Sequence, residues 1–528
     1  MKILFLLLIT FNLALFAQEI DSSRAIIINN QVSKFQNLLK TIELNYVDSV
    51  DLVKISEAAY KAMLKELDQQ SFYWTEEEYK SIVNQQQGVS TYGIGATFLA
   101  INDSIFITDI IPNSSADSAG LEIGDIILFV DDKKVSGNGS SNSINVINGD
   151  INSKVSLIIK RNSEVGLNEI SLNRGSYPIS SVKAKLLISN TKIGYLKINT
   201  FTQSTYNDVI SSINSLKKSG LEKVIIDLRD NPGGLLEEAI KVIGLFIEKD
   251  ALITKLVGKN SIYIQEYKSK VDPIFKDIPL SILVNKETAS SSEIFAGTIQ
   301  DYDRGIIVGE KTFGKGTVQN AWVFGDSSAF RMTISKYTTP SGRPVEKTEK
   351  SEEINIDSRF MDEEIVKDIK KSMEMFGGSN KVGVFRSEGG RLIIAPGGII
   401  PDKIIEQDRL TLLTRVYLER NYITEYALKY FIENKTEIKK KYKDNYKEFI
   451  EKFEISTEML NEFSNVINKY KVFNQEMYEK DKVYLLNYLK AKIAQFVWGD
   501  NAYHYGLIYI DKQVIEAIKA IPVTSKID

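Results

Sequence analysis

The chain has 528 residues, of which 43% are hydrophobic and 26% charged, a composition typical of soluble globular proteins with about two to four domains. Lys and Arg total 66 against 69 for Asp and Glu, so the net charge of -3 gives no electrostatic reason to expect a nucleic-acid partner. There is one histidine, His504, and no cysteine. A Cys–His catalytic pair and a thiolate zinc site are therefore excluded, and a histidine-rich metal site cannot be built. For a catalytic serine, a base other than histidine is expected.

The N-terminus has the layout of a cleavable secretory signal. Lys2 precedes an apolar run over residues 3–16, which ends in Ala17 before a polar stretch. We expect a signal peptide over residues 1–17 and a periplasmic or otherwise exported protein. A retained membrane anchor is the alternative, because Leu15 is a poor residue at the third position before the cut.

Two regions of different texture follow. Residues 18–85 are predicted to be helical, because apolar residues recur at three- and four-residue spacing and indicate two or three helices between Phe35 and Tyr79. Between residues 86 and 175, short β-rich runs are separated by Gly, Asn, Asp and Ser. Several short strands at that spacing predict a compact barrel or sandwich.

Strands and helices alternate in the region from residue 176 to 407. Helices are predicted over about residues 206–218, 235–246 and 291–302, between the apolar strand segments IGYLKI, KVIIDLR, LSILV and GIIVG. This alternation predicts an α/β region with a largely buried sheet. Dense charges at about residues 347–385 indicate an inserted excursion.

Residues 408–528 are rich in Lys, Glu and Tyr and have long helical periodicity, which predicts a C-terminal helical domain. These helices could pack on the α/β region, form a self-association contact or recruit an adaptor, and the sequence does not choose among the three. His504 lies here and is expected to be a surface or packing residue. The fold class expected for the whole chain is multidomain α/β (α+β).

Ser290 stands at a predicted strand-to-helix junction in the segment TASSSEI. Free N–H groups and the positive end of the helix dipole favour negative charge there, which suits a serine nucleophile. The competing interpretation is a simple N-cap, since serine begins many helices for hydrogen-bonding reasons alone.

Lys315 stands between two glycines in TFGKGT, a setting that allows close backbone approach and burial of the side chain. A general base must be neutral, and a lysine begins near pKa 10.4, so work at neutral pH requires a pKa lowered by roughly three units. Desolvation in an apolar pocket does this, and Phe313 and Val318 are candidate walls. An ordinary lysine in a glycine turn is the alternative.

The segment IIDLRDNPGGLLEEA at residues 225–239 is a predicted buried strand that runs into a Pro-Gly-Gly loop and then a helix. Such a loop can direct backbone N–H groups at a developing oxyanion. It lacks the glycine spacing of phosphate-binding and dinucleotide-binding motifs, so those functions have weak support. By itself a strand–glycine–helix segment of this kind is more often just a turn.

Together these segments resemble the carboxyl-terminal processing proteases, tail-specific serine peptidases that use a Ser-Lys dyad. The resemblance rests on TASSSEI, QDYDRGIIVGEKTFGKGTVQ, LRDNPGG and the closing GGIIPD, and it extends from the N-terminus to about residue 402. It implies a crotonase/ClpP-like catalytic core and no metal or organic cofactor.

The resemblance assigns roles residue by residue. Ser290 is implied as the nucleophile, Lys315 as the general base and Gln319 as the residue that helps to position the lysine. The backbone N–H groups of Gly234 and Ser291 are implied as the oxyanion hole. The chain departs from the family with Thr288 and Ser291 in place of the commoner serine and alanine, and LDQQSFYW at residues 67–74 lacks the usual Pro and His, which puts its local turn in doubt.

The β-rich module, residues 86–175, resembles a PDZ domain inserted before the catalytic core. Tyr92, Gly93, Ile94 and Gly95 are implied as the loop that binds a substrate carboxylate, and SAGLEIGDIIL is the matching strand entry. Successive N–H groups in such a loop can hold a terminal carboxylate while the peptide adds to an open sheet edge. A tight Gly-Ile-Gly turn is the alternative.

The function expected from these features is that of an exported serine endopeptidase, which captures protein substrates by their C-terminal tails and cleaves them with the Ser290–Lys315 dyad. One alternative is a peptide-binding scaffold that kept the fold and lost catalysis. Another is a different Ser-Lys hydrolase, such as an amidase for small substrates, which would not need a PDZ-like module.

Overall fold

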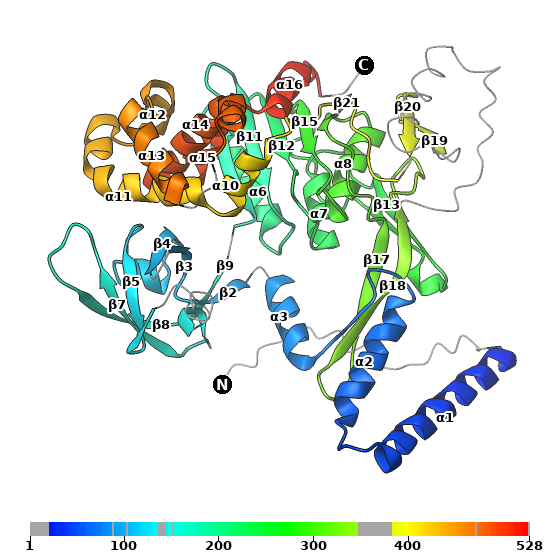
Figure 1. Cartoon of the computed structure of the whole chain (residues 1–528). Coiled ribbons are helices and arrows are strands. Elements are labelled where there is room, and N and C mark those ends of the chain that lie inside the picture. The colour runs from blue at the N-terminus through cyan, green and yellow to red at the C-terminus, as the bar shows by residue number, and fades with distance from the viewer. Residues whose placement is uncertain are drawn as a thin grey trace, which may run out of the picture. The chain divides into compact units, whose positions relative to one another are not determined.

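The computed structural model describes residues 21–86, 89–101, 104–135, 144, 146–149, 151–178, 180–346, 383–395, 397–469 and 473–525 (Figure 1). The predicted signal peptide and almost all of the predicted charged insertion lie outside these residues. The chain forms two compact units. One comprises Met1–Thr75 with Ala321–Met332, and the other Glu76–Asn320 with Thr333–Asp528.

The smaller unit holds the helices α1 (Ser22–Asn45) and α2 (Leu52–Lys65) and the strand β1 (Phe72–Trp74). The turn before β1 is fixed by one carboxylate, since Asp68 accepts hydrogen bonds from the Gln70 amide at 2.7 Å and the Ser71 hydroxyl at 3.0 Å. The segment LDQQSFYW therefore forms its turn without the family's Pro and His. The strand then pairs antiparallel with residues 329–331.

The β-rich module lies in the larger unit and contains a sheet in the order β3-β4-β5-β7-β8, with β6 beside β5. Its strands are β3 (Ala96–Ile101), β4 (Ser104–Ile110), β5 (Ile126–Val130), β6 (Lys133–Lys134), β7 (Lys154–Lys160) and β8 (Asn168–Asn173), and α4 (Ser115–Ser118) is its short helix. β3 is an edge strand of this sheet. A second ribbon, β2 (Val89–Gly93) paired with β9 (Gly175–Pro178), joins the two ends of the module, as expected for an insertion.

The central sheet of the α/β region has the order β10-β11-β12-β15-β16-β21. Only the pairing of β10 with β11 is antiparallel, and the other pairings are parallel. Its strands are β10 (Val182–Leu187), β11 (Ile193–Ile198), β12 (Lys223–Asp227), β15 (Leu280–Val284), β16 (Ile306–Gly309) and β21 (Lys403–Ile404), and its helices are α6 (Thr205–Lys218), α7 (Leu236–Gly244) and α8 (Ser291–Asp301). The three helices begin and end within two residues of their predicted bounds.

A second sheet contains β18 between β13 and β1, with β14 beyond β13 and β17 paired to β18. Its strands are β13 (Leu252–Gly258), β14 (Gln265–Lys268), β17 (Thr317–Val323) and β18 (Ala329–Thr338), and η2 (Ser261–Tyr263) is a short 3-10 turn. A separate hairpin pairs β19 (Gly383–Arg386) with β20 (Leu392–Ala395).

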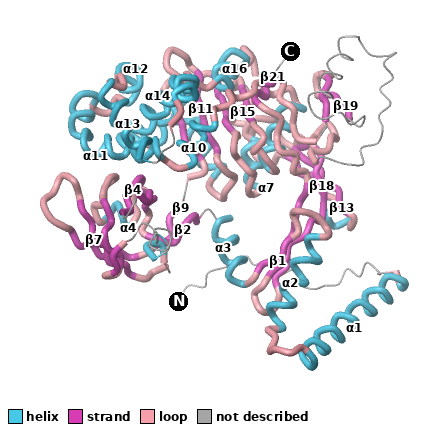
Figure 2. Tube along the Cα trace, in the orientation of Figure 1, coloured by secondary structure: helices cyan, strands magenta, loops and turns pink. Residues whose placement is uncertain are grey.

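The C-terminal region is helical throughout its described residues and is coloured yellow to red in Figure 1; Figure 2 separates the same helices from the strands by colour. Its helices are α10 (Leu412–Glu419), α11 (Tyr422–Tyr442), α12 (Tyr446–Lys452), α13 (Thr457–Lys469), α14 (Gln475–Trp498), α15 (Asp500–Ile508) and α16 (Lys512–Ala520).

Both faces of the central sheet are buried, and different helices cover them. Tyr195 and Ile225 pack in one apolar cluster with the C-terminal helices, whereas their neighbours Leu196 and Ile226 pack in another with α6, α7 and α8. This alternation follows from the two-residue repeat of a strand, and it explains why these strands are apolar runs. Of the three roles left open for the C-terminal helices, packing on the α/β region is the one observed.

Candidate active site

Ser290 lies at the N-terminal end of α8, in the loop that leaves β15. Its backbone has φ 57° and ψ -122°, a region that a residue with a side chain rarely adopts and that marks local strain. The loop is tied to the segment after β12, since the Thr288 hydroxyl donates to the Leu228 carbonyl at 2.9 Å and the Ala289 amide to that of Asn231 at 3.0 Å. The strained position is thus held by bonds from its own loop.

The glycines of the Pro-Gly-Gly loop lie against Ser290. A Cβ atom built on Gly233 would come within 2.8 Å of the Ser290 Cβ and 3.1 Å of the Ser291 nitrogen, so no larger residue fits. The Ser291 hydroxyl donates to the Gly234 carbonyl at 2.9 Å. Within the described residues, the amides of Gly234 and Ser291 donate to no protein acceptor. Both amides are therefore available as donors, which is one requirement of an oxyanion site.

Glu293 connects the serine loop to the lysine loop. Its Oε2 accepts from the amides of Ser290 at 2.9 Å and Lys315 at 2.8 Å, and its Oε1 from the Gly314 amide at 2.7 Å and the Thr312 hydroxyl at 2.5 Å. The side chain is fully buried, and this desolvation raises the pKa of the carboxyl although all four hydrogen bonds favour the charged form. One carboxylate thus holds the backbones of both proposed dyad residues.

Lys315 is half-buried in the loop between β16 and β17. Phe313, expected as an apolar wall beside it, is 60% exposed, so that expectation was wrong; its backbone amide bonds to the Thr288 carbonyl while its ring points to solvent. Val318 is partly buried and packs against the apolar core. Gln319 donates through Nε2 to the hydroxyls of Thr317 at 2.8 Å and Thr333 at 3.4 Å.

The proposed carboxylate-binding loop leads from β2 into β3. The Ile94 carbonyl accepts from the Ala116 amide at 2.8 Å and the Gly95 carbonyl from the Ile111 amide at 2.9 Å, so the loop is bonded both to α4 and to the residue that follows β4. Tyr92 lies in β2 and pairs with Ser176 of β9. Since β3 is an edge strand, the loop leads into an open hydrogen-bonding edge.

Other parts of the matched motifs have structural partners. In QDYDRG, the guanidinium of Arg304 donates to the carbonyls of Phe246, Phe275 and Ile278 at 2.7 to 2.9 Å and closes that side of the core. In GGIIPD, the Ile399 amide donates to the Thr312 hydroxyl at 2.6 Å and so supports a partner of Glu293. Sequence reasoning assigned these residues no role, because such contacts depend on the tertiary fold.

The C-terminal helices contribute to a buried polar cluster behind the Pro-Gly-Gly loop. Arg229 donates to Asp227 and also to Asp511 at 2.6 Å and Gln513 at 3.0 Å, both from the start of α16. Arg229 and Lys197 hold the pKa of Asp227 well below its usual range, despite its burial. His504 lies next to Tyr195, and burial lowers the pKa of its imidazole to about 4, so the packing role expected for it is observed.

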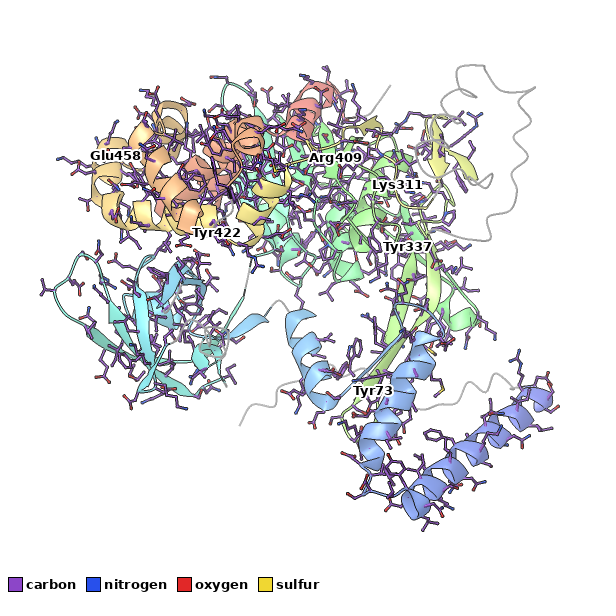
Figure 3. All side chains as sticks on the ribbon, viewed as in Figure 1. Tyr73, Lys311, Tyr337, Arg409, Tyr422 and Glu458 are labelled. Carbon is purple, nitrogen blue, oxygen red and sulfur yellow. The ribbon has the colours of Figure 1, made fainter. Side chains whose placement is uncertain are left out.

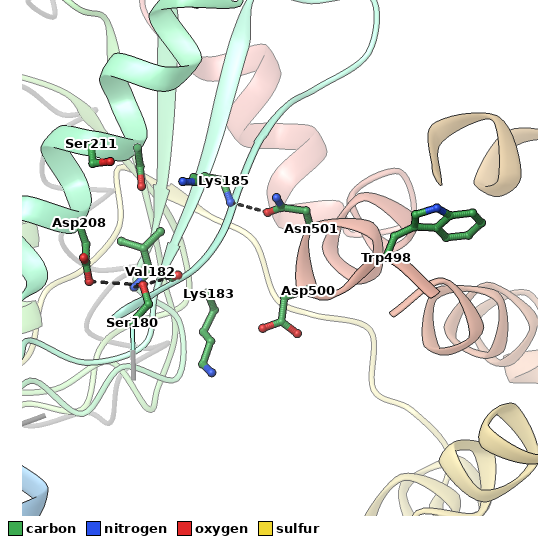
Figure 4. Close-up of a pocket in the computed structure, with 10 residues that line it drawn as sticks. Ser180, Val182, Lys183, Lys185, Asp208, Ser211, Trp498, Asp500 and Asn501 are labelled. Carbon is green, nitrogen blue, oxygen red and sulfur yellow. Dashed lines mark hydrogen bonds between the residues drawn. The ribbon is translucent and has the colours of Figure 1, made fainter. Parts of the chain in front are cut away.

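A polar pocket of about 300 Å³ lies between β10, α6 and the start of α15 (Figure 4). Lys183, Asp208 and Asp500 line it, and at its edge the Asn501 side chain accepts from the Lys185 amide at 2.8 Å. It contains none of the residues predicted for the active site. Across the described part of the chain, no group of three or more His, Cys, Asp or Glu side chains is arranged to hold a metal ion.

This arrangement matches known families. Residues 192–356 match peptidase family S41 and residues 93–172 match the PDZ domain, while residues 413–499 match a family of unknown function. The chain therefore contains an S41 peptidase domain together with a PDZ domain, and the resemblance drawn from the sequence is confirmed. The mixed α/β fold class with a C-terminal helical region is confirmed as well.

Among the relatives are staphylococcal proteins named "Probable CtpA-like serine protease". That of Staphylococcus aureus (strain COL) is 36% identical over 317 residues, and that of Staphylococcus haemolyticus (strain JCSC1435) is 35% identical over 316 residues. The matches cover 59% and 60% of this chain and 62% of each relative, so the chain spans less than two thirds of their length. A solved photosystem II D1 C-terminal processing protease aligns over 71% of this chain and 93% of its own, at 21% identity and a TM-score of 0.35.

Proposed function

We propose that this chain is an exported serine endopeptidase that binds protein substrates by their C-terminal tails and cleaves them with a Ser-Lys dyad. The observation that carries the proposal is the Glu293 carboxylate, which accepts hydrogen bonds from the backbone amides of both Ser290 and Lys315. A nucleophile and its base need a fixed separation, because a displacement of about 1 Å can cost about a hundredfold in rate. The S41 match and the serine-protease relatives support the same reaction class.

In the proposed mechanism, Ser290 attacks the substrate carbonyl while Lys315 accepts the hydroxyl proton. The amides of Gly234 and Ser291 donate to the oxyanion of the tetrahedral intermediate, and the positive end of the α8 dipole adds to this stabilisation. Lys315 then protonates the leaving amine, and water hydrolyses the acyl-enzyme. Gln319 helps to orient the lysine. The reaction uses no metal and no organic cofactor.

Tail recognition is assigned to the PDZ domain. The amides around Gly93, Ile94 and Gly95 receive the terminal carboxylate, and the peptide adds to the edge of β3 as an extra strand. Tyr92 completes the loop. Partners are thus proteins or peptides with a free C-terminus, and the nearly balanced charge of the chain favours no nucleic acid.

The test is cleavage of a disordered protein that ends in an apolar tail, at about pH 7 to 9. We expect Ser290→Ala and Lys315→Ala to abolish cleavage with an unchanged circular dichroism spectrum. The matched controls are Ser211→Ala and Lys286→Ala, which change exposed residues outside the site and should cleave normally. Cleavage that survives Ser290→Ala would mean that the nucleophile lies elsewhere.

The peptide-binding scaffold is the second candidate, and the PDZ match is the observation that favours it. It predicts that the wild type binds tail peptides but cleaves none of them. Cleavage can also be compared among proteins that differ only in their last few residues. An amidase for small substrates would show no dependence on these residues.

Export is proposed from the signal-like N-terminus. No helix among the described residues is long and apolar enough to cross a bilayer. We expect the processed protein in the periplasmic or secreted fraction, with cleavage after Ala17 detectable by N-terminal sequencing. A mature protein that retains its first residues and sediments with membranes would instead support a retained anchor.

A further inference from the structure

Tyr337 in β18, labelled in Figure 3, is one of the largest fully buried side chains, at 1% exposure, and it takes no part in the proposed mechanism. Its backbone amide donates to the Gly316 carbonyl at 2.9 Å, so the strand is bonded directly to the lysine loop. The ring therefore projects from a strand that is already fixed against the proposed base.

The hydroxyl of Tyr337 reaches two backbone carbonyls, that of Ser290 at 3.1 Å and that of Lys315 at closer range. A phenol has a single proton, so it donates to one carbonyl at a time or shares the proton between the two. Burial, reinforced by the negative charges of Glu293 and Glu346, raises the pKa of Tyr337 well above its ordinary value. The group is thus a neutral donor at every pH at which the enzyme would work.

Glu293 and Tyr337 hold complementary groups of the same two residues. The carboxylate accepts from the N–H groups of Ser290 and Lys315, and the phenol donates to their C=O groups. Each proposed dyad residue is therefore held on both sides of the Cα atom from which its side chain projects. The Ser290 carbonyl also accepts from the amides of Glu293 at 2.8 Å and Ile294 at 3.1 Å at the start of α8, and the phenol adds the bond that joins this carbonyl to that of Lys315.

We propose that Tyr337 is a positioning residue of the dyad, and that its hydroxyl fixes the separation of the Ser290 and Lys315 backbones. The inference rests on the proposed function, because it concerns the efficiency of proton transfer between those two side chains. Tyr337 contacts neither substrate nor reacting atoms in this proposal and acts through the two carbonyls alone.

The test is Tyr337→Phe, which removes one oxygen and leaves the ring in the core. We expect kcat for the tailed substrate to fall about 10- to 100-fold, with KM within about twofold, because tail binding takes place on the PDZ domain. The matched control is Tyr302→Phe. The Tyr302 hydroxyl donates to one backbone carbonyl, that of Leu252 in β13 at 2.8 Å, so both variants lose a hydrogen bond from a phenol to the backbone. Each should lower Tm by a few degrees, about 2–4 °C.

A merely structural role for Tyr337 would give the two variants similar kcat values at a temperature where circular dichroism shows both folded, and that result would overturn the inference. A fall in kcat matched by an equal rise in KM would overturn it as well. If Tyr337→Phe unfolds near the assay temperature, kcat is measured at about 10 °C and normalised to the folded fraction. Failure of the proposed function is distinguishable, since Ser290→Ala or Lys315→Ala would then keep cleaving.

Discussion

Replacing Glu293 with glutamine keeps the shape of the side chain but removes one acceptor oxygen and the charge. If the amide oxygen stays where Oε1 is, the bonds from Thr312 and Gly314 survive. The amide NH₂ then faces the N–H groups of Ser290 and Lys315, which are donors and need an acceptor. The bonds lost are therefore the two that hold the proposed dyad.

The magnitude follows from these two bonds. A hydrogen bond to a charged group contributes about 1.5–3 kcal/mol, so the gross loss is about 3–6 kcal/mol. The variant no longer buries a charge, and this relief offsets part of the loss. We expect a net fall in the free energy of unfolding of about 2–3 kcal/mol and a fall in kcat of about a hundredfold or more.

The pH dependence has a definite sign. Burial raises the pKa of the Glu293 carboxyl in the folded protein. The contribution of this group to the free energy of unfolding is therefore fully present below its unfolded pKa and is lost as pH rises through its folded pKa. The difference in unfolding free energy between the wild type and Glu293→Gln should therefore narrow as the pH rises above the unfolded pKa of a glutamate, about 4.3. A widening gap would show that the four hydrogen bonds outweigh burial.

The assay combines urea denaturation followed by circular dichroism with steady-state cleavage of the tailed substrate. Glu287→Gln is the matched control, because Glu287 is exposed in the loop that precedes α8 and its change should alter neither quantity. A folded Glu293→Gln variant with kcat within threefold of the wild type would refute the role given to this carboxylate.

Two further predictions concern other regions. Asp511→Asn keeps the helix cap but removes the charge that pairs with buried Arg229, so urea denaturation should show a free energy of unfolding lower by about 1–2 kcal/mol. The control Asp408→Asn breaks an exposed ion pair and should lower it by at most about 1 kcal/mol. Equal losses in the two variants would contradict this prediction. Gly95→Ala should weaken binding of a labelled tail peptide at least tenfold, measured by fluorescence anisotropy, because the added Cβ would lie 2.2 Å from the Cβ of Ser114. The control Gly166→Ala has similar backbone strain but no atom within 4 Å of the added Cβ, and it should bind the peptide normally. If Gly166→Ala binds as weakly as Gly95→Ala, the prediction is wrong.

The sequence predicts the architecture well where one local pattern dominates. The apolar strands and intervening helices of the α/β region follow from residue spacing, and Ser290 falls at a strand-to-helix junction for the same reason. The burial of these strands on both faces already implied a second layer of helices, although the sequence alone did not identify residues 408–528 as that layer.

Contacts between distant segments were beyond sequence reasoning. Tyr337 lies 22 residues from Lys315 and 47 from Ser290, and only the register of β18 against the lysine loop brings its hydroxyl to them. Glu293 is visible in the sequence only as part of TASSSEI, because three of its four hydrogen-bond donors lie on the separate lysine loop. The expectation that Phe313 forms an apolar wall failed because local sequence does not fix the direction of an aromatic ring beside a glycine-flanked lysine, and this residue is exposed.

The two-sided burial of the central sheet has a consequence for biosynthesis. About 210 residues separate Val308 in β16 from the end of α16, so at roughly 5–20 residues per second the helices that cover one face emerge about 10–40 s after the strands they cover. During that interval the face carrying Tyr195, Ile225 and Val308 has no intramolecular cover, and Arg229 lacks both partners from α16. A nascent chain would thus hold the Ser290–Lys315 segment before the sheet that carries it is covered, so the proposed activity would have to wait for the helices of residues 412–520.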